Sequence, residues 1–361
     1  MLFLYINLAF IDSMMVKKDL TKVSQVQIKQ ESDVFGISEC HVTYQSAQAL
    51  KSRLCTMSLS DDKQVIEAAE WIGCQMQDLL SEEVLLRIKS FSESDQESAL
   101  IIRGLPLGDT LPPTPYEGFI ENDELLLANA IHTGIYNLAG FHPIAYEHEN
   151  NGRIFRHVVP TKDAKGKKSS HGSDVTFGFH VDKPDLPIIP ESLNGKSACP
   201  ELLSLMAIRS DLKVNSSVVL LDDVLSRLNQ GVIQILMSDQ FLISRPDSFS
   251  GSLSSRLPVL AFDRNNVAYS RYDKENVTPI TPQAAAALLM FEAALEKPEN
   301  VHSTVFLPGD MLLIKNQRTL HRREAYIPRE DGADRWLIRL FGMKSKQRLL
   351  SLPNCSHIGK D

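Results

Sequence analysis

The sequence predicts a mainly β fold with flanking helices, and three observations lead to this class. From about residue 150 onward, short apolar or alternating segments are separated by clusters of Gly, Pro, Asn and Asp, which is typical of all-β domains. Two segments with helical patterning interrupt this series, and a longer helical region precedes it. With 361 residues, 43% of them hydrophobic, the chain can build a sizeable core within one large β domain or roughly two average domains.

Composition divides the chain into three expected parts. Residues 1–60 form an N-terminal extension, which begins with a short apolar stretch and is polar and aperiodic from Lys17 onward. The apolar stretch is too short to span a bilayer and lacks the basic residues that open a signal peptide. The main domain is expected over residues 61–345, and residues 346–361 form a C-terminal tail.

The first part of the main domain is expected to be helical around one buried strand. In 61–89, apolar residues recur near helical spacing, and an aspartate at the start can cap the first helix. The apolar run 99–106 ends in glycine and proline and predicts a buried strand. Residues 123–139 are helical again, so these helices are expected to cover a sheet.

The rest of the main domain is expected to consist of short strands with two inserted helices. The helices are 222–238 and 282–295, and the second opens with Thr281-Pro282 in the order typical of a helix start. A polar segment rich in Gly and Lys, 161–173, is either a lid or a solvated loop. The expected strands are 153–159, 174–180, 202–208, 217–221, 259–262, 301–306 and 311–314.

Charge and cysteine content limit the classes of partner. The net charge of −7 and a pI of about 5.8 argue against a nucleic-acid-binding protein, which needs clustered Lys and Arg. The cysteines are dispersed without a C-x-x-C pair, so neither a zinc knuckle nor a disulfide framework is expected. Free thiols favour a reducing compartment. We therefore expect a cytoplasmic protein with a small-molecule partner and no membrane segment; the sequence does not predict the oligomeric state. The cysteines are Cys40, Cys55, Cys74, Cys199 and Cys355.

Three side chains form a candidate metal site. Residues 178–183 read Gly-Phe-His-Val-Asp-Lys, and positions i and i+2 of a strand point to one face, so His180 and Asp182 can reach the same ion. A further histidine, His321, follows the apolar strand at 311–314. Two histidines and one carboxylate form the facial triad of non-haem Fe(II) oxygenases, which leaves coordination positions open. The same ligands also suit the catalytic zinc of a hydrolase.

A pair of arginines follows the candidate metal site. Asp331-Gly332 predicts a hairpin turn, and in the strand expected after it Arg335, Leu337 and Arg339 share one face. An unpaired buried charge is costly, and a guanidinium binds a carboxylate as a bidentate fork. The two arginines are therefore expected to bind two small-molecule carboxylates. The alternative is that they face solvent or bridge protein acids.

These residues resemble the Fe(II)/2-oxoglutarate dioxygenases of the clavaminate synthase-like group, within the taurine dioxygenase-like superfamily. That group includes L-asparagine oxygenase and arginine and lysine hydroxylases. The resemblance rests on His180-x-Asp182, His321 and the segment 331–339, and it extends from the strand at 101–106 to about residue 341. It implies a double-stranded β-helix, also called a jelly roll, with a cupin-like core and flanking helices.

The resemblance also implies the cofactors and the roles of the site residues. Fe(II) would be bound by the catalytic residues His180, Asp182 and His321, with 2-oxoglutarate as cosubstrate and O2 as oxidant. Arg335 would bind the distal carboxylate of 2-oxoglutarate, and Arg339 would bind the carboxylate of an amino-acid substrate.

The chain departs from the pattern of the group at two positions. Many amino-acid hydroxylases of the group carry glutamate where this chain has Asp182, and the group commonly has glycine where this chain has Arg322.

Two further segments are candidates for contact with the substrate. Asp273 and Glu275 lie where related arginine and lysine hydroxylases place acidic contacts, and both could clamp a cationic side chain. The alternative is a solvated acidic loop neutralised by neighbouring basic residues. The turn at 147–152 resembles the family loop that contacts the substrate backbone, which implies contacts from Glu149 and Asn150.

The expected function is that of a non-haem Fe(II)- and 2-oxoglutarate-dependent dioxygenase. It would hydroxylate an unactivated C–H bond of a free L-amino acid with a basic side chain, lysine or arginine. The alternatives are a dioxygenase that acts on another small acid or a carrier-bound aminoacyl group, and a non-catalytic amino-acid-binding module on the same fold. A zinc hydrolase would leave Arg335 and Arg339 without a purpose.

Overall fold

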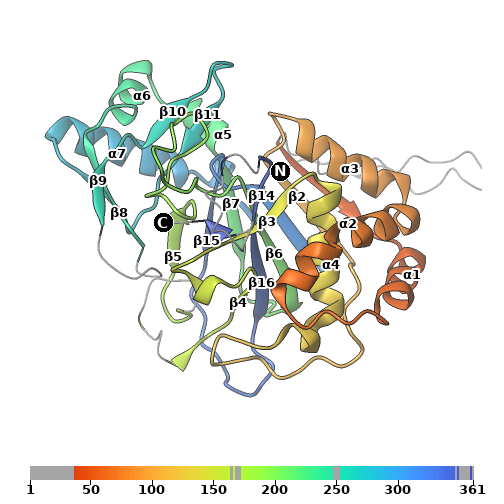
Figure 1. Cartoon of the computed structure of the whole chain (residues 1–361). Helices are drawn as coiled ribbons and strands as arrows, with labels where there is room; N and C mark the ends of the chain where they lie inside the picture. Colours follow the sequence, from red (N-terminus) through yellow and green to blue (C-terminus); the bar gives the residue numbers. More distant parts are fainter. Residues whose placement is uncertain are drawn as a thin grey trace, which may run out of the picture. The chain divides into compact units, whose positions relative to one another are not determined.

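The computed structural model describes residues 36–162, 166, 172–246, 253–345, 348 and 358–359. They lie within one compact unit, residues 33–361. Its centre is formed by β sheets, and helices lie outside them (Figure 1). The predicted mainly β class with flanking helices is therefore confirmed.

The larger sheet is built mostly from antiparallel strands. β1–β2 and β3–β17 pair in parallel, and β4 (Arg156–Val158) pairs with β16 beside the main path. The other strands, in spatial order, are β1 (Ile37–His41), β2 (Ala99–Arg103), β14 (Met311–Lys315), β6 (Leu202–Arg209), β16 (Trp336–Met343), β3 (His142–Tyr146) and β17 (Ile358–Gly359).

The smaller sheet has four antiparallel strands and completes the jelly roll. In order they are β13 (His302–Thr304), β7 (Ser216–Leu220), β15 (Thr319–Arg323) and β5 (Phe177–His180). From β4 to β7, and again from β13 to β16, the chain alternates between the two sheets. This alternation is the topology of a double-stranded β-helix, and apolar side chains of both sheets, among them Leu203, Val218 and Leu337, share one core.

Helices cover the outer face of the larger sheet. They are α1 (Tyr44–Leu54), α2 (Asp62–Leu79), α3 (Glu82–Glu93) and α4 (Leu126–Leu138), preceded by the 3-10 turn η1 (Asn122–Leu125). Their apolar faces share a second core with Met206, Ile338 and Leu340 of the sheet. The side chain of Asp61 caps α2 by accepting a hydrogen bond from the backbone N–H of Gln64.

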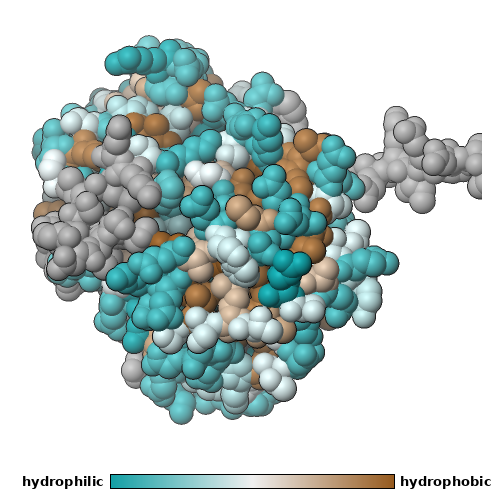
Figure 2. Space-filling model, turned by 45° about the vertical axis from the view of Figure 1, so that its right-hand side comes forward, coloured by the Kyte–Doolittle hydropathy of each residue, from teal (hydrophilic) through white to brown (hydrophobic). Residues whose placement is uncertain are grey.

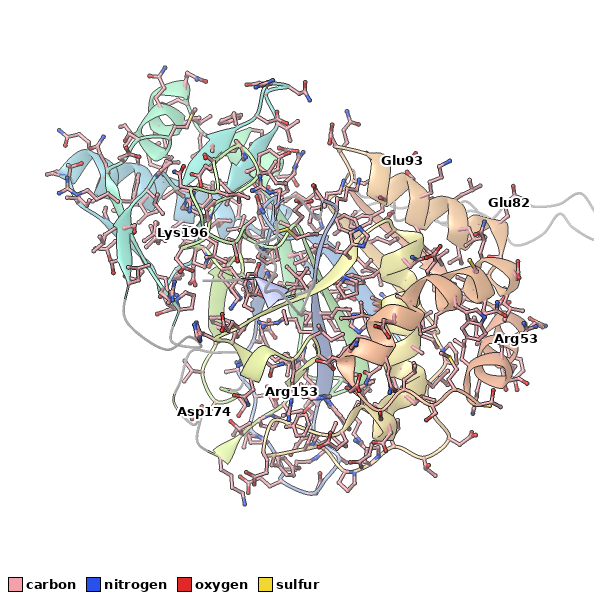
Figure 3. All side chains as sticks on the ribbon, in the orientation of Figure 1. Arg53, Glu82, Glu93, Arg153, Asp174 and Lys196 are labelled. Atoms are coloured by element: carbon pink, nitrogen blue, oxygen red, sulfur yellow. The ribbon has the colours of Figure 1, made fainter. Side chains whose placement is uncertain are left out.

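The outward faces of α1, α2 and α3 are mostly polar, whereas α4 is buried along most of its length. Arg53, Glu82 and Glu93 are exposed and point away from the sheet (Figure 3). Figure 2 brings this side of the molecule forward and shows hydrophilic side chains interspersed with small hydrophobic areas. The helices predicted within 61–89 and 123–139 are thus confirmed.

An insertion lies between β7 and β13 and packs its own apolar core against the smaller sheet. The helix predicted over 222–238 is in fact two helices, because Asn229 caps the second by accepting from the N–H of Val232. The insertion consists of α5 (Leu221–Leu225), α6 (Gln230–Leu236), β8 (Phe241–Ser244), β9 (Ser254–Arg256), β10 (Leu260–Phe262), β11 (Ala268–Ser270), β12 (Val277–Pro279), α7 (Pro282–Leu295) and the 3-10 turn η4 (Pro298–Asn300).

The hairpin predicted at Asp331-Gly332 is wrong. Gly332 lies in a turn with a φ of 82°, but β15 before it belongs to the smaller sheet and β16 after it to the larger one. An Asp-Gly pair specifies a local reversal of the backbone and not the strand that the chain joins next. The strand predicted after the turn is confirmed as β16.

Several expected segments lie partly outside the described residues. Within the extension expected over 1–60, the described part includes β1, which pairs with β2, and α1. Most of the segment expected as a lid or solvated loop, 163–165 and 167–171, lies outside the described residues, as does most of the expected tail. In the described part of the chain, no helix has the length and apolar composition needed to cross a membrane.

Candidate metal centre

The pairing of β5 with β15 sets the two candidate histidines side by side. His180 is directly opposite His321 in this register, and the centroids of the two rings are 4.1 Å apart. Asp182 follows β5, and its Oδ1 lies 3.7 Å from Nε2 of His180. One ligand atom from each of the three residues lies within 4.8 Å of the others, so the three side chains converge on a single point.

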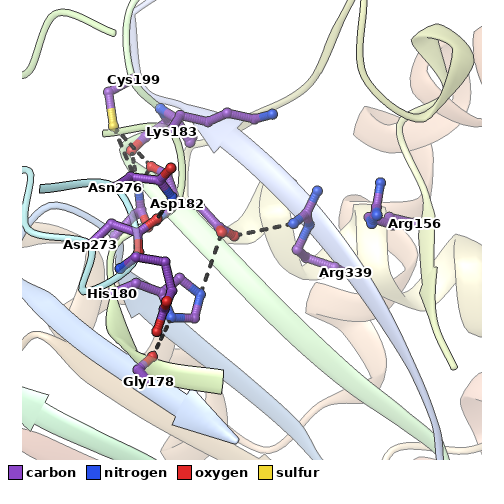
Figure 4. A network of polar contacts seen from close by, with 12 residues as sticks. Arg156, Gly178, His180, Asp182, Lys183, Cys199, Asp273, Asn276 and Arg339 are labelled. Atoms are coloured by element: carbon purple, nitrogen blue, oxygen red, sulfur yellow. Dashed lines mark hydrogen bonds and ion pairs between the residues drawn. The ribbon is translucent and has the colours of Figure 1, made fainter. Parts of the chain in front are cut away.

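Hydrogen bonds fix the orientation of this triad. Nδ1 of His180 lies 2.8 Å from the carbonyl oxygen of Gly178, which leaves Nε2 facing Asp182 (Figure 4). The backbone N–H of Asp182 donates to Oδ1 of Asn316 at 2.9 Å, and Nδ2 of Asn316 donates to the carbonyl of Asp182 at 2.9 Å. The turn that carries the carboxylate is therefore anchored on both sides.

The pKa values of His321 and Asp182 suit binding of a divalent metal. Desolvation, helped by the nearby charge of His180, lowers the pKa of His321 to about 3, so that its ring is neutral near pH 7. Burial would raise the pKa of Asp182, but Arg339, His321 and His180 hold it below its usual value. Nδ1 of His321 is buried and has no hydrogen-bond partner among the described residues. Two imidazoles and one carboxylate fit the facial triad of non-haem iron.

A pocket between the two sheets contains the triad. Its walls are largely apolar, and the polar side chains gather around the triad and two arginines, Arg335 directly before β16 and Arg339 within it. The lining residues are Val158, Phe177, His180, Asp182, Leu205, Ser216, Ser217, Val218, Leu312, His321, Arg322, Arg323, Arg335, Leu337 and Arg339. The alternation predicted for 335–341 places Arg335, Leu337 and Arg339 in this pocket and Trp336, Ile338 and Leu340 in the core beneath the helices.

Arg335 is a buried cation without a carboxylate partner among the described residues. Only 4% of its surface is exposed, and Nη2 donates to Oγ of Ser216 at 2.9 Å. Burial, opposed by Tyr326, lowers the pKa of Arg335 to about 10. The guanidinium nevertheless remains charged near pH 7, so this end of the pocket carries a buried positive charge that no carboxylate of the described residues compensates.

Arg339, at the other end, is already paired with two carboxylates. Nη2 lies 2.6 Å from Oε1 of Glu149, and Nη1 lies 3.3 Å from Oδ2 of Asp182. Glu149 is buried and also meets Nζ of Lys183 at 2.6 Å and Nη1 of Arg156 at 3.7 Å. The candidate residue Glu149 therefore belongs to a buried cluster of charges next to the triad.

The other substrate candidates lie in different settings. Asp273 is buried, and its backbone forms an isolated β-bridge with that of His180 (Figure 4). Its carboxylate accepts from the N–H of Glu275 at 3.0 Å and from Nδ2 of Asn276 at 2.6 Å. Burial raises the pKa of Asp273. Glu275 is exposed and does not line the pocket. The side chain of Asn150 donates to the backbone carbonyls of its own loop.

Sequence reasoning missed three basic residues of the site. Lys183 follows a candidate ligand directly, Arg156 stands two residues before the pocket residue Val158, and Arg323 stands two residues after His321. The spacing of two along a strand could have identified Arg156 and Arg323. Lys183 gave no such signal, because its backbone adopts a left-handed turn with a φ of 63°.

Comparison with known proteins gives concordant matches. Residues 242–341 match the family described as "Taurine catabolism dioxygenase TauD, TfdA family". The chain is 29% identical over 267 residues to L-asparagine oxygenase of Streptomyces coelicolor, a match that covers 71% of this chain and 74% of that protein. It is 26% identical over 272 residues to L-lysine 3-hydroxylase of Catenulispora acidiphila, covering 73% and 72%. With clavaminate synthase 2 of Streptomyces clavuligerus it is 25% identical over 318 residues, covering 84% and 91%.

The fold agrees with that of solved structures. A crystal structure of asparagine oxygenase in complex with Fe(II), 2S,3S-3-hydroxyasparagine and succinate superimposes with a TM-score of 0.76. The two chains are 23% identical, and the match covers 90% of this chain and 99% of that one. The family match, the relatives and the fold agree: the chain is similar to the TauD/TfdA dioxygenases and, among them, to L-asparagine oxygenase, L-lysine 3-hydroxylase and clavaminate synthase 2.

Proposed function

We propose that this protein is an Fe(II)- and 2-oxoglutarate-dependent dioxygenase that hydroxylates an unactivated C–H bond of a free L-amino acid. The observation that carries the proposal is the presence, in one pocket, of a convergent His-Asp-His triad and of Arg335, a buried cation with no carboxylate partner among the described residues. A metal ligand set alone would also suit zinc. The additional site for an anion favours an enzyme with an acidic cosubstrate.

His180, Asp182 and His321 would hold the iron. When bound, iron together with 2-oxoglutarate and dioxygen supplies the oxidising chemistry that the side chains themselves lack, and 2-oxoglutarate is converted to succinate and carbon dioxide. The triad leaves coordination positions open for these reactants.

The remaining pocket residues bind and orient. Arg335 would hold the distal carboxylate of 2-oxoglutarate through a bidentate fork, beside the hydroxyl of Ser216. Arg339 would hold the carboxylate of the substrate next to the triad. Leu205, Leu312 and other apolar side chains form the walls and exclude water from the reacting groups.

We further propose that the preferred amino acid has a basic side chain. In support, Asp273 is buried beside His180, so a carboxylate lies close to the metal centre. Relatives named L-lysine 3-hydroxylase and enduracididine beta-hydroxylase match the chain at 26% and 25% identity. The match to L-asparagine oxygenase is 29%, so the neutral amide asparagine is the alternative that the test must include.

Location in a reducing, cytoplasmic compartment belongs to the same proposal. The described residues Cys40, Cys55, Cys74 and Cys199 are free thiols, and free thiols suit such a compartment. The expected partner is the small amino acid itself, without nucleic acid or membrane.

Turnover of a panel of amino acids tests the proposal. The enzyme is reconstituted anaerobically with Fe(II) and supplied with 2-oxoglutarate and oxygen, and both succinate and a mass gain of one oxygen are measured for the twenty L-amino acids, ornithine and citrulline. We expect coupled succinate and hydroxylated product with lysine or arginine. Asparagine as the best substrate would overturn the basic preference alone, and absence of succinate from enzyme with bound iron would overturn the proposed activity. Asp182→Asn serves as the inactive control.

A further inference from the structure

The carboxylate of Glu149 is saturated by cations of the protein itself. Its Oε2 lies 2.6 Å from Nζ of Lys183, and its Oε1 lies 2.6 Å from Nη2 of Arg339 and 3.7 Å from Nη1 of Arg156. The exposed fractions of the Glu149 and Lys183 side chains are 4% and 3%. Both oxygens of the acid are therefore occupied within the folded chain.

Lys183 is held in this position by the backbone as well as by charge. It directly follows Asp182 and adopts a φ of 63°, which turns its side chain away from the direction that an extended strand would give. Its ammonium group lies 5.1 Å from the centre of the Tyr146 ring and 5.8 Å from that of Phe341. Figure 4 shows the side chain extending from the turn that carries Asp182. A tethered ammonium competes with a free one at a large effective concentration.

The charges of the cluster do not balance. Three cations, Arg156, Lys183 and Arg339, face two carboxylates, Glu149 and Asp182. A carboxylate that enters beside Arg339 compensates the excess positive charge. An ammonium group that enters at the same place meets three like charges and finds no vacant acceptor on Glu149.

We propose that Lys183 occupies the position on Glu149 that a substrate ammonium group would need, so that the site selects its substrate by the carboxylate and does not require a charged α-nitrogen. This inference rests on the proposed function and deepens it. The substrate class then includes free amino acids and, equally, amino-acid carboxylates whose α-nitrogen is absent or carries no charge. Lys183 is in this sense a specificity-determining residue.

Binding of matched ligand pairs tests the proposal. Each L-amino acid found to bind the Fe(II)- and 2-oxoglutarate-loaded enzyme is compared, by anaerobic calorimetry, with its des-amino acid, in which hydrogen replaces the ammonium group. A smaller group cannot clash, so the pair reports only on the ammonium. We expect the wild-type affinities to agree within about threefold. Lys183→Met keeps the length of the side chain but frees Oε2 of Glu149. We expect this variant to bind the amino acid at least tenfold more tightly than the des-amino acid.

Three variants separate specificity from damage to the fold. Lys183→Arg keeps the cation and should retain the wild-type ratio, and Lys183→Met combined with Glu149→Gln should lose the regained preference. Lys196→Met, a change at an exposed lysine, is the matched control for loss of a lysine. If Lys183→Met does not fold, Glu149→Gln alone tests the proposal. A glutamate that does not contact the ligand can be replaced without changing the ratio of the affinities for the amino acid and the des-amino acid.

The outcomes distinguish the inference from the proposed function. A wild-type preference of tenfold or more for the amino acid, unchanged in Lys183→Met, overturns the inference and leaves the function intact. Failure of every amino acid and every des-amino acid to bind overturns both, because the inference needs a carboxylate at Arg339. Loss of binding by the amino-acid amide, with the des-amino acid still bound, supports recognition through the carboxylate.

Discussion

The two ends of the pocket are each centred on an arginine, and they differ in how the charge is compensated. Arg335 directly precedes β16 and Arg339 lies within it; both line the pocket, and both are buried, at 4% and 8% exposed. Arg339 pairs with Glu149 and Asp182. Arg335 has no carboxylate partner among the described residues and donates to the hydroxyl of Ser216.

The difference shows which end depends on a ligand. A buried charge is tolerated when protein groups of opposite sign lie against it, as at Arg339, and is costly when they do not. The pKa values follow this pattern. Burial lowers the pKa of Arg335 to about 10, whereas at Arg339 Glu149 and Asp182 outweigh burial and raise the pKa above its usual value. The charge of Arg339 is thus compensated within the chain, whereas the proposed function assigns compensation of Arg335 to the distal carboxylate of 2-oxoglutarate.

The largest expected effect concerns binding of the cosubstrate. Arg335→Met should weaken binding of 2-oxoglutarate about 100- to 1000-fold, because loss of one partner of a buried charge pair costs roughly 2–5 kcal/mol. Arg335→Lys keeps the charge but cannot form the bidentate contact, so its affinity for 2-oxoglutarate should lie between those of the wild type and Arg335→Met. Anaerobic calorimetry with the Fe(II)-loaded protein measures the affinity. Arg339→Met is the matched control and should change it by less than about fivefold; an equal loss in both variants would contradict the division of the pocket.

The next effect concerns stability and has opposite signs at the two ends. Arg339→Met should lower the free energy of unfolding by about 3 kcal/mol, because it leaves two buried carboxylates short of a partner. Arg335→Met should leave the free energy unchanged or raise it by about 1 kcal/mol, since it removes a desolvated cation. Urea denaturation of the metal-free, ligand-free protein gives both values. Destabilisation of similar size in both variants would show that Arg335 has a partner within the chain.

An intermediate effect is expected on acidification. Burial alone would raise the pKa of Glu149, but Arg339, Lys183 and Arg156 hold it well below the ordinary value of 4.5. A carboxyl with a lowered pKa stabilises the fold above its unfolded-state pKa, and this contribution is lost as the pH falls below that value. The free energy of unfolding should therefore fall by about 1–3 kcal/mol more between pH 5 and pH 3 in the wild type than in Glu149→Gln. Parallel pH profiles would show that Glu149 titrates normally.

The smallest effect is expected at Glu296, a residue that does not line the pocket. Glu296 directly follows α7, pairs with Arg322 at 2.6 Å and has a side chain that is 49% exposed. Solvent screens such a pair, so Glu296→Gln should change the free energy of unfolding by less than about 0.5 kcal/mol. The same urea titration measures it, and a larger change would mean that exposed and buried pairs of this protein cannot be ranked by burial.

Local patterns accounted for much of the fold. The helices at 61–89 and 123–139 and the strand at 99–106 could be predicted because each has a clear apolar period and recognisable ends. The prediction at Asp331-Gly332 was wrong, because a turn motif is local, whereas the next partner of a strand is chosen by packing at a distance. The split of the helix predicted over 222–238 depended on a single cap at Asn229.

The candidate site was likewise predicted only in part from the sequence. Strand periodicity alone predicted that His180 and Asp182, and likewise Arg335 and Arg339, share a face, because alternate residues of a strand point the same way. In the structure Asp182 directly follows the end of β5 and Arg335 directly precedes β16. The tertiary structure decided that β5 and β15 pair with His180 opposite His321, and that Glu149 lies between Lys183 and Arg339. Residues 149, 183 and 339 come from separate segments, and an ion pair depends on distance in space. The sequence by itself therefore determined which chemical groups are present and which share a face, and only the folded chain decided which charges meet.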